Sequence, residues 1–280
     1  MIPNNLLKYF KGFSKEFPSY FRVKNPNFFL MMRYYLRKPT FRYLLQLFFK
    51  NPFRIIFNTL FYLPKVFWIN FLNKFNKRDF YADSKIKNVI IDFSKGKGFI
   101  TISYCQKPFD CPDGRFSYKC SASYERCKRC FLYQVKTKCD KLNLDYYIVL
   151  GDLDSVWNIL SNQFDKYLSA SYILTTCNMV LNVVKYISPL FGFTGIILPF
   201  NKGSCLTIYA YELSEFGYKN VQTDISDDNK KLLIDILDKA IAIKENYKKN
   251  SRSINLGEKL PLLDGKAHIY HTNQRRHRVL

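Results

Sequence analysis

The chain has 280 residues, of which 48% are hydrophobic, and carries a formal net charge of +22 at pH 7. This apolar content is enough for a full core and excludes a wholly disordered chain. The charge is uneven, because residues 1–78 hold fifteen basic residues and one acidic residue. We therefore predict a basic, aromatic helical region at residues 1–78, a cysteine-rich α/β domain at 79–248 and a polar basic tail at 249–280.

The N-terminal residues do not form the apolar run of a secretory signal peptide. Such a run is uninterrupted and ends in small residues at a cleavage site, whereas Lys8, Lys11 and Lys15 break it here. We therefore expect the protein in the cytosol or on the cytoplasmic face of the cell membrane, where thiols stay reduced. In that compartment, dense cysteines favour metal binding or catalysis over disulfide bonds.

Regularly spaced prolines divide the N-terminal region into short blocks. Pro26, Pro39, Pro52 and Pro64 are separated by 13, 13 and 12 residues. Proline is tolerated in the first turn of a helix and disfavours helix in the residue before it. The spacing predicts three or four short amphipathic helices, each opened by its proline, with aromatic side chains on one side and basic ones on the other.

Basic and aromatic helices of this kind suit a membrane interface, where rings lie at the headgroup level and cations face anionic lipid. The excess of basic residues is also typical of the cytoplasmic side. A spanning or re-entrant segment at residues 55–73 is less favoured, since it contains Pro64, Lys65 and three asparagines. A soluble helical subdomain packed on the core is a third alternative. The predicted membrane contacts are Arg33, Arg37, Arg42, Phe49, Arg54, Phe57, Phe61, Lys65, Trp68 and Phe71.

The middle of the chain alternates between strand-like and helix-like segments. Alternation of this kind predicts βαβ units, and hence an α/β fold with a mainly parallel sheet, helices on both faces and a cysteine-rich insert. The predicted strands are residues 87–93, 98–104, 144–151, 170–176, 194–200 and 218–224, and the predicted helices are residues 152–168, 178–190 and 226–249.

Three cysteines each follow a predicted strand. Cys105 follows the strand at 98–104, Cys177 follows 170–176, and Cys205 follows 194–200 after a short loop. In open α/β sheets, ligands bind at the carboxyl ends of the strands. If the strands are parallel, the three thiols share one sheet edge, with the segment 111–130 above them.

Six of the eight cysteines fall within 35 residues, between Cys105 and Cys139. One pair, Cys127 and Cys130, has the two-residue gap that lets two thiolates bind one metal ion. Neighbouring arginines and lysines would lower thiol pKa values and offset the negative charge of a thiolate site. The segment therefore predicts a metal site, with a zinc ion and an iron–sulfur cluster both open.

Other interpretations of the cysteines stay open. A thioredoxin-like CxxC would follow a strand and start a helix, and the sequence after Cys130 fits only the helix half. Free cysteines are also common as small buried hydrophobes, which is the interpretation we favour for Cys139. No histidine precedes His268, which excludes a mixed His/Cys site and Ser-His-Asp or Cys-His catalysis in the core domain. The three histidines lie in the basic tail, at His268, His271 and His277.

The ordered segments "SYCQ", "CPDGRFSYKC", "CKRC", "TTC" and "KGSC" resemble the uncharacterised prokaryotic family catalogued as domain of unknown function 116. The resemblance covers roughly residues 85–240, with Tyr104 where relatives are expected to have a histidine-like position. It implies a cysteine-rich, metal-binding protein with an N-terminal membrane segment, and no established activity. The metal ligands it supports are Cys105, Cys111, Cys120, Cys127, Cys130, Cys177 and Cys205.

These observations predict a peripheral membrane protein that binds an iron–sulfur cluster or zinc through cysteines. With an iron–sulfur cluster, electron transfer and a protein redox partner would follow. One alternative is a thiol-dependent enzyme with Cys177 or Cys205 as nucleophile at the sheet edge. Another is a nucleic-acid-binding zinc protein that uses the basic ends. Nucleic acid is the less favoured partner, because the aromatic residues lie in apolar helical runs and not on an exposed polar platform. Whether the protein is an enzyme stays open.

Overall fold

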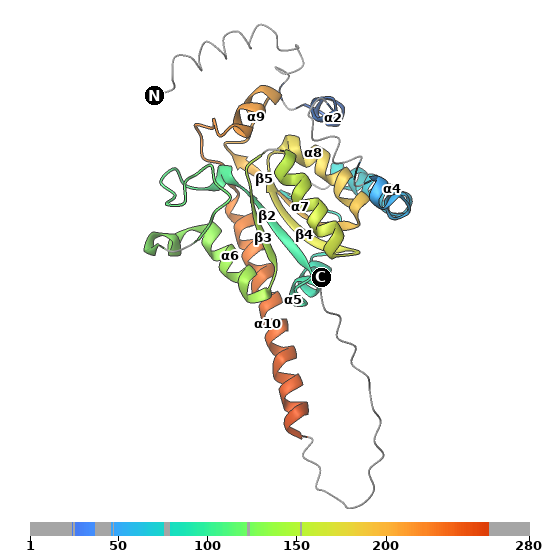
Figure 1. Cartoon of the computed structure of the whole chain (residues 1–280), viewed down its shortest axis with the longest axis vertical. Helices are drawn as coiled ribbons and strands as arrows, with labels where there is room; N and C mark the ends of the chain where they lie inside the picture. Colours follow the sequence, from blue (N-terminus) through green and yellow to red (C-terminus); the bar gives the residue numbers. More distant parts are fainter. Residues whose placement is uncertain are drawn as a thin grey trace, which may run out of the picture. The chain divides into compact units, whose positions relative to one another are not determined.

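The structure is a computed structural model of the chain (Figure 1). It describes residues 24, 26–36, 46, 48–75, 79–121, 124–151 and 153–257. Contacts divide the chain into two units, Met1–Lys244 and Glu245–Leu280. The fold described below belongs to the first unit, and its last helix, α10 (Asp227–Gly257), begins there.

The core of the first unit is a six-stranded sheet with the order β1-β5-β4-β2-β3, in which β6 also pairs with β5. The four central strands β3, β2, β4 and β5 are parallel, and β1 and β6 run antiparallel to β5. The predicted mainly parallel α/β sheet is therefore confirmed. The strands are β1 (Tyr81–Ala82), β2 (Gly98–Ser103), β3 (Asp145–Val149), β4 (Ala170–Thr176), β5 (Phe193–Lys202) and β6 (Asp224–Ile225).

Helices cover both faces of this sheet, as predicted (Figure 1). Successive strand side chains point to opposite faces, so Ile100 and Ile102 pack on one side and Phe99 on the other. The face of Ile100 is covered by α5 (Ile86–Ser94), α6 (Phe131–Leu142) and the first part of α10. The face of Phe99 is covered by α7 (Leu153–Lys166) and α8 (Asn178–Ile187).

The direction of the chain reverses between β2 and β4. From β2 the chain passes through α6 to β3, and from β3 it returns through α7 to β4, which lies on the other side of β2. It then continues outward through α8 to β5. In doubly wound sheets such a reversal opens a crevice at the carboxyl ends of the two central strands. The topology therefore places a binding crevice between the loops that follow β2 and β4.

The predicted strand at residues 87–93 is wrong, because this segment forms helix α5. Val89 and Phe93 are fully buried, and their spacing of four residues places them on one helical face. The short run of branched apolar residues here fits both periods, and packing on the sheet selects the helix. The predicted strand at 218–224 is also mostly wrong: only Asp224 pairs, in the two-residue strand β6.

The proline rule for the N-terminal helices holds in part. Helix α2 (Phe28–Tyr35) follows Pro26, with the Asn27 side chain accepting a hydrogen bond from Leu30 N. Helix α4 (Pro52–Phe75) begins at Pro52 but continues through Pro64, so a separate helix opened by Pro64 is wrong. Pro39 lies outside the described residues. Proline removes one backbone hydrogen bond, and the packing of α4 on the rest of the unit outweighs that loss.

Both described N-terminal helices pack on the α/β core. Met31, Tyr34 and Tyr35 of α2 are buried, and the Tyr34 hydroxyl donates to Glu215 Oε2 at 2.6 Å. From α4, the Arg54 guanidinium donates to the carbonyl oxygens of four core residues and lies over a phenyl ring 3.8 Å away. The acceptors are Phe164, Tyr167, Leu168 and Phe191, and the ring is that of Phe164.

The predicted membrane contacts fall in different places. Arg54 faces the core, and Arg37 and Arg42 lie outside the described residues, as does the side chain of Phe71. Among the described residues, no helix combines the length and hydropathy needed to span a membrane. The remaining predicted contacts are exposed, namely Arg33, Phe49, Phe57, Phe61, Lys65 and Trp68.

Replacing Arg54 tests how firmly α4 is held on the core. Arg54→Met leaves carbonyl oxygens without their donor, so we expect the free energy of unfolding to fall by about 2 kcal/mol. The measurement is urea unfolding followed by circular dichroism. Leu60→Met, at an exposed position of the same helix, is the control and should leave stability unchanged. Equal stability of both variants would show that the Arg54 contacts do not hold α4.

Candidate functional site

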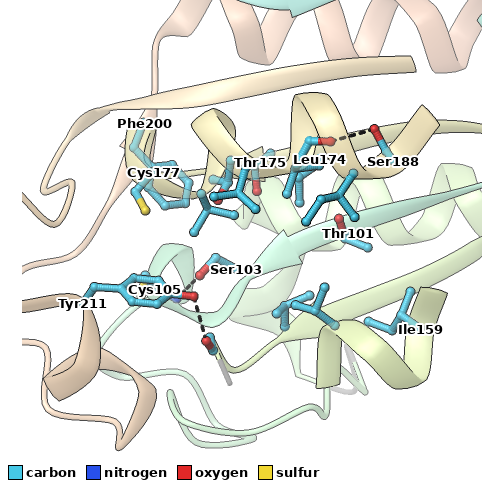
Figure 2. Close-up of a pocket in the computed structure, with 18 of the residues that line it drawn as sticks. Thr101, Ser103, Cys105, Ile159, Leu174, Thr175, Cys177, Ser188, Phe200 and Tyr211 are labelled. Carbon is cyan, nitrogen blue, oxygen red and sulfur yellow. Dashed lines mark hydrogen bonds between the residues drawn. The ribbon is translucent and has the colours of Figure 1, made fainter. Parts of the chain in front are cut away.

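A cavity of about 120 Å³ lies on the sheet face that α7 and α8 cover (Figure 2). Its floor is formed by β2 and β4, and its sides by apolar residues of the two helices. The cavity reaches the carboxyl edge of the sheet, where the chain direction reverses. Fold and cavity thus agree on one place for a ligand.

Cys105, Cys177 and Cys205 all line this cavity. Cys105 lies in the 3-10 turn η2 (Tyr104–Gln106) directly after β2, Cys177 is the N-cap of α8 directly after β4, and Cys205 follows β5. Figure 2 shows Cys105 with Tyr211 on one wall and Cys177 with Phe200 on the facing wall. The structure therefore brings together the three thiols that the strand ends were expected to share, and none is more than 7% exposed.

Basic side chains lie near these thiols, and the Arg115 guanidinium donates to the carbonyl oxygen of Cys105 at 3.4 Å. The Lys219 ammonium donates to Cys205 Sγ at 3.0 Å. Burial, reinforced by the nearby Cys205, raises the pKa of Cys177 to about 12, and burial also raises the pKa of Cys105. The charge of Lys219 opposes both pKa shifts. Cys177 and Cys105 are therefore neutral thiols at pH 7 in the metal-free protein.

Hydrogen bonds fix the loops around the cavity. The Tyr211 hydroxyl donates to the carbonyl oxygen of Gly151 at 3.0 Å, and Gly151 has a φ of +95° that favours glycine. At the ends of the two central strands, the Thr175 hydroxyl donates to Gln106 Oε1, which ties β4 to the loop after β2. The loops after β2 and β3 are thus held in place by hydrogen bonds from side chains of β4 and α9 (Ile208–Glu215).

A second group of cysteines lies in the insert. Burial, together with the charges of Cys130 and Cys111, raises the pKa of Cys120 to about 11, and Cys120 and Cys130 pack against the same hydrophobic core. Lys107 is 1% exposed, and its ammonium donates to the carbonyl oxygens of Ser117 at 3.1 Å and Lys119 at 2.8 Å. A buried cation therefore organises the loop that carries Cys111 and Cys120.

The remaining two cysteines, Cys127 and Cys139, differ from each other in burial. Cys127 is half-buried in the short helix η3 (Glu125–Arg129), and Cys139 is fully buried in the core side of α6. All eight thiols are free. Among the residues that the structure describes, no three His, Cys, Asp or Glu side chains are arranged to hold a metal ion as they stand. His268, His271 and His277 lie outside those residues.

Three features of the site were not predicted from the sequence. Lys219 lay within a predicted strand, and only its loop conformation brings it to Cys205. Lys107 follows Cys105 closely, but a lysine there gives no signal of burial. Tyr35 of α2 lines the cavity although it lies far away in the sequence. The contributions of separate loops and of a distant helix to one site can be recognised only once the fold is known.

Comparison with protein-family models, curated proteins and solved structures gives no match for this chain. The resemblance of the ordered cysteines to a cysteine-rich family therefore stays a prediction.

The raised pKa of Cys177 has a measurable consequence. Only the thiolate is alkylated, so the rate of iodoacetamide labelling at Cys177, followed by mass spectrometry, should still be rising at about pH 10. Lys219→Met removes a charge that lowers the pKa of Cys177, and should shift this profile to higher pH. Lys202→Met at the exposed end of β5 is the control. A plateau below about pH 9 would contradict the burial of a neutral thiol.

Proposed function

We propose that this protein binds a thiophilic metal centre, an iron–sulfur cluster or zinc, through cysteines at the carboxyl edge of its sheet. The observation that carries the proposal is the meeting of Cys105, Cys177 and Cys205, from three separate loops, at one cavity. Thiolates are the ligands that both metal centres prefer. Three protein ligands also leave a fourth position for a further cysteine or for a substrate.

The insert offers further ligands. Cys120 and Cys130 pack against the same core, Cys111 acts electrostatically on Cys120, and Cys127 is separated from Cys130 by the two residues typical of metal-binding pairs. These thiols would complete the coordination at the edge or hold a second metal centre. The proposed ligand set is the one predicted from the sequence, with Cys139 left out because it is buried in the hydrophobic side of α6.

The electrostatics of the site fit a metal centre. Neutral buried thiols cost little in the metal-free protein, and a metal ion binds by displacing their protons. The resulting thiolate charge would be offset by Lys219 near Cys205 and by the buried Lys107 near Cys120. Among the described residues, no group of three or more potential ligands is already arranged to hold a metal ion. Metal binding would therefore require the thiols to move closer together.

Metal analysis is the primary test. We expect full-length protein, purified without oxygen or chelators, to contain stoichiometric metal: iron with matching sulfide and a broad visible absorption, or zinc in a colourless protein. An iron–sulfur cluster would support electron transfer with a protein redox partner. Protein that contains neither metal under these conditions would overturn the proposal.

Cysteine variants locate the metal. Cys177→Ala should lower the metal content to a small fraction of the wild-type value, because an edge ligand is lost. Cys139→Ala is the matched control, since Cys139 is equally buried but lies in the hydrophobic side of α6. Thermal unfolding of both variants shows whether they fold. Equal metal content in the two folded variants would contradict binding at the sheet edge.

We also propose that the protein associates peripherally with anionic membranes on the cytoplasmic face. The support is the set of exposed residues on α4, where the rings of Phe57 and Phe61 are tilted to each other with centroids 4.3 Å apart, beside exposed Lys65 and Trp68. Rings of this kind insert at the headgroup level, and the many basic residues of 1–78 would be attracted to anionic lipid.

The double variant Phe57→Ser and Phe61→Ser tests this association. Loss of two exposed rings should weaken binding to phosphatidylserine vesicles by about tenfold or more, measured by co-sedimentation of the full chain. The control is Phe216→Ser, which removes an exposed ring after α9 (Ile208–Glu215). Binding that is equally strong in the double variant and the control would remove α4 as the membrane contact.

A thiol-dependent enzyme is a second candidate, and the contact between Lys219 and Cys205 favours it. A cation beside a cysteine stabilises the thiolate, which is the nucleophile. Cys205 would then be alkylated much faster than every other cysteine in metal-free protein at neutral pH. Uniformly slow labelling of the buried cysteines would exclude this candidate and leave the metal proposal standing.

A further inference from the structure

We propose that the cavity between α7 and α8 binds an elongated apolar molecule with an anionic end group, of the class of medium-chain carboxylates. The apolar chain would lie over β2 and β4, and the anion would lie at Lys219. This ligand site goes beyond the proposed metal centre and does not depend on it.

The first argument is the gap in the helical cover of the sheet. Every residue of the central strand β4 is buried except Leu174, which is half-buried and lines the cavity. On the facing helices, Leu160 of α7 and Val180 and Val184 of α8 are also half-buried and line the cavity. Neighbouring helices on a sheet normally close over such a strand. Here apolar side chains from three elements surround space instead, which a hydrocarbon would fill favourably.

The second argument is the shape of the cavity. It is lined along β2 from Phe99 to Ser103, which is about 13 Å at the usual rise per strand residue. Its volume of about 120 Å³ is similar to that of apolar protein cavities that take up benzene, about 150 Å³. The cavity is partly open to solvent, so a volume of this size would hold the buried part of an extended chain, and the length along β2 fits such a chain better than a fused ring system.

The third argument is the distribution of polar groups. Among the described residues that line the cavity, Lys219 is the only charged one, and it lies with the cysteines at the carboxyl edge. Its ammonium has three donors, so it can bind a carboxylate oxygen while it donates to Cys205. The Tyr211 hydroxyl and the Ser214 hydroxyl already donate to backbone carbonyl oxygens. The cavity is thus apolar along its length and cationic at one end, which selects an apolar chain with an anionic head.

Calorimetric titration of the full-length protein with decanoate is the direct test. We expect saturable binding with a negative heat-capacity change, which marks burial of apolar surface. Decanol should bind more weakly because it lacks the charge, and decyltrimethylammonium more weakly still because Lys219 repels it. Absence of saturable decanoate binding, or equal affinity for the three compounds, would overturn the proposal.

Variants separate the cavity from the exposed aromatic surface of α4, which could also adsorb amphiphiles. Val184→Phe fills the cavity and should weaken decanoate binding by about tenfold or more. Leu181→Phe is the matched control, on the same helix but outside the cavity lining. Lys219→Gln should lower the affinity for decanoate but not for decanol, and Lys202→Gln should change neither. Decanoate binding that is unchanged in folded Val184→Phe would overturn the proposal.

If Val184→Phe does not fold, ligand binding can still be measured on the wild-type protein. The measurement is protection of a cysteine in the cavity from alkylation. Decanoate in the cavity should slow iodoacetamide labelling of Cys177 while leaving the half-buried Cys127 unaffected. Equal labelling rates with and without saturating decanoate would contradict binding beside Cys177. Metal content is measured on the same preparations, so loss of the metal centre and loss of the ligand site are distinguishable.

Discussion

The reversal of chain direction between β2 and β4 is the constraint on which the site depends. Two neighbouring parallel strands send their connections to opposite sides, so the loops after them diverge and leave a crevice. Cys105 and Cys177 lie in those two loops, and β5 adds Cys205 from the adjacent strand end. The three cysteines are far apart in the sequence, and they meet because the sheet aligns the ends of the three strands. The same divergence separates α7 from α8 over Leu174 and so also produces the cavity.

Burial then decides the chemical state of the thiols. A thiolate in an apolar crevice loses hydration, so the pKa of Cys177 and that of Cys105 rise and both stay protonated at neutral pH. The ammonium of Lys219 opposes this effect at the sheet edge. Cys105 and Cys177 therefore stay neutral in the absence of a further positive charge, and a bound metal cation would favour their thiolate forms. The proposed metal centre and the proposed anionic ligand would both interact with Lys219, whose charge lies at the end of an apolar cavity.

The sequence predicted the parts of the fold that obey a simple period. The segments that form β2 to β5 are short and mostly apolar, and the convergence of three cysteines followed from parallel strands with a common edge. The error at α5 arose because a short run of branched apolar residues fits a strand and a helix equally well. Lys219 and the cavity could not be predicted, since both depend on how loops and helices from distant parts of the chain meet.

The N-terminal helices extend this site beyond the α/β domain. Tyr35 of α2 lines the cavity, and its neighbour Tyr34 donates to Glu215 at the end of α9. Helix α4 is held to the core by Arg54, and the same helix exposes Phe57 and Phe61. A contact that shifted α2 would therefore change the wall of the cavity and the surroundings of Cys177.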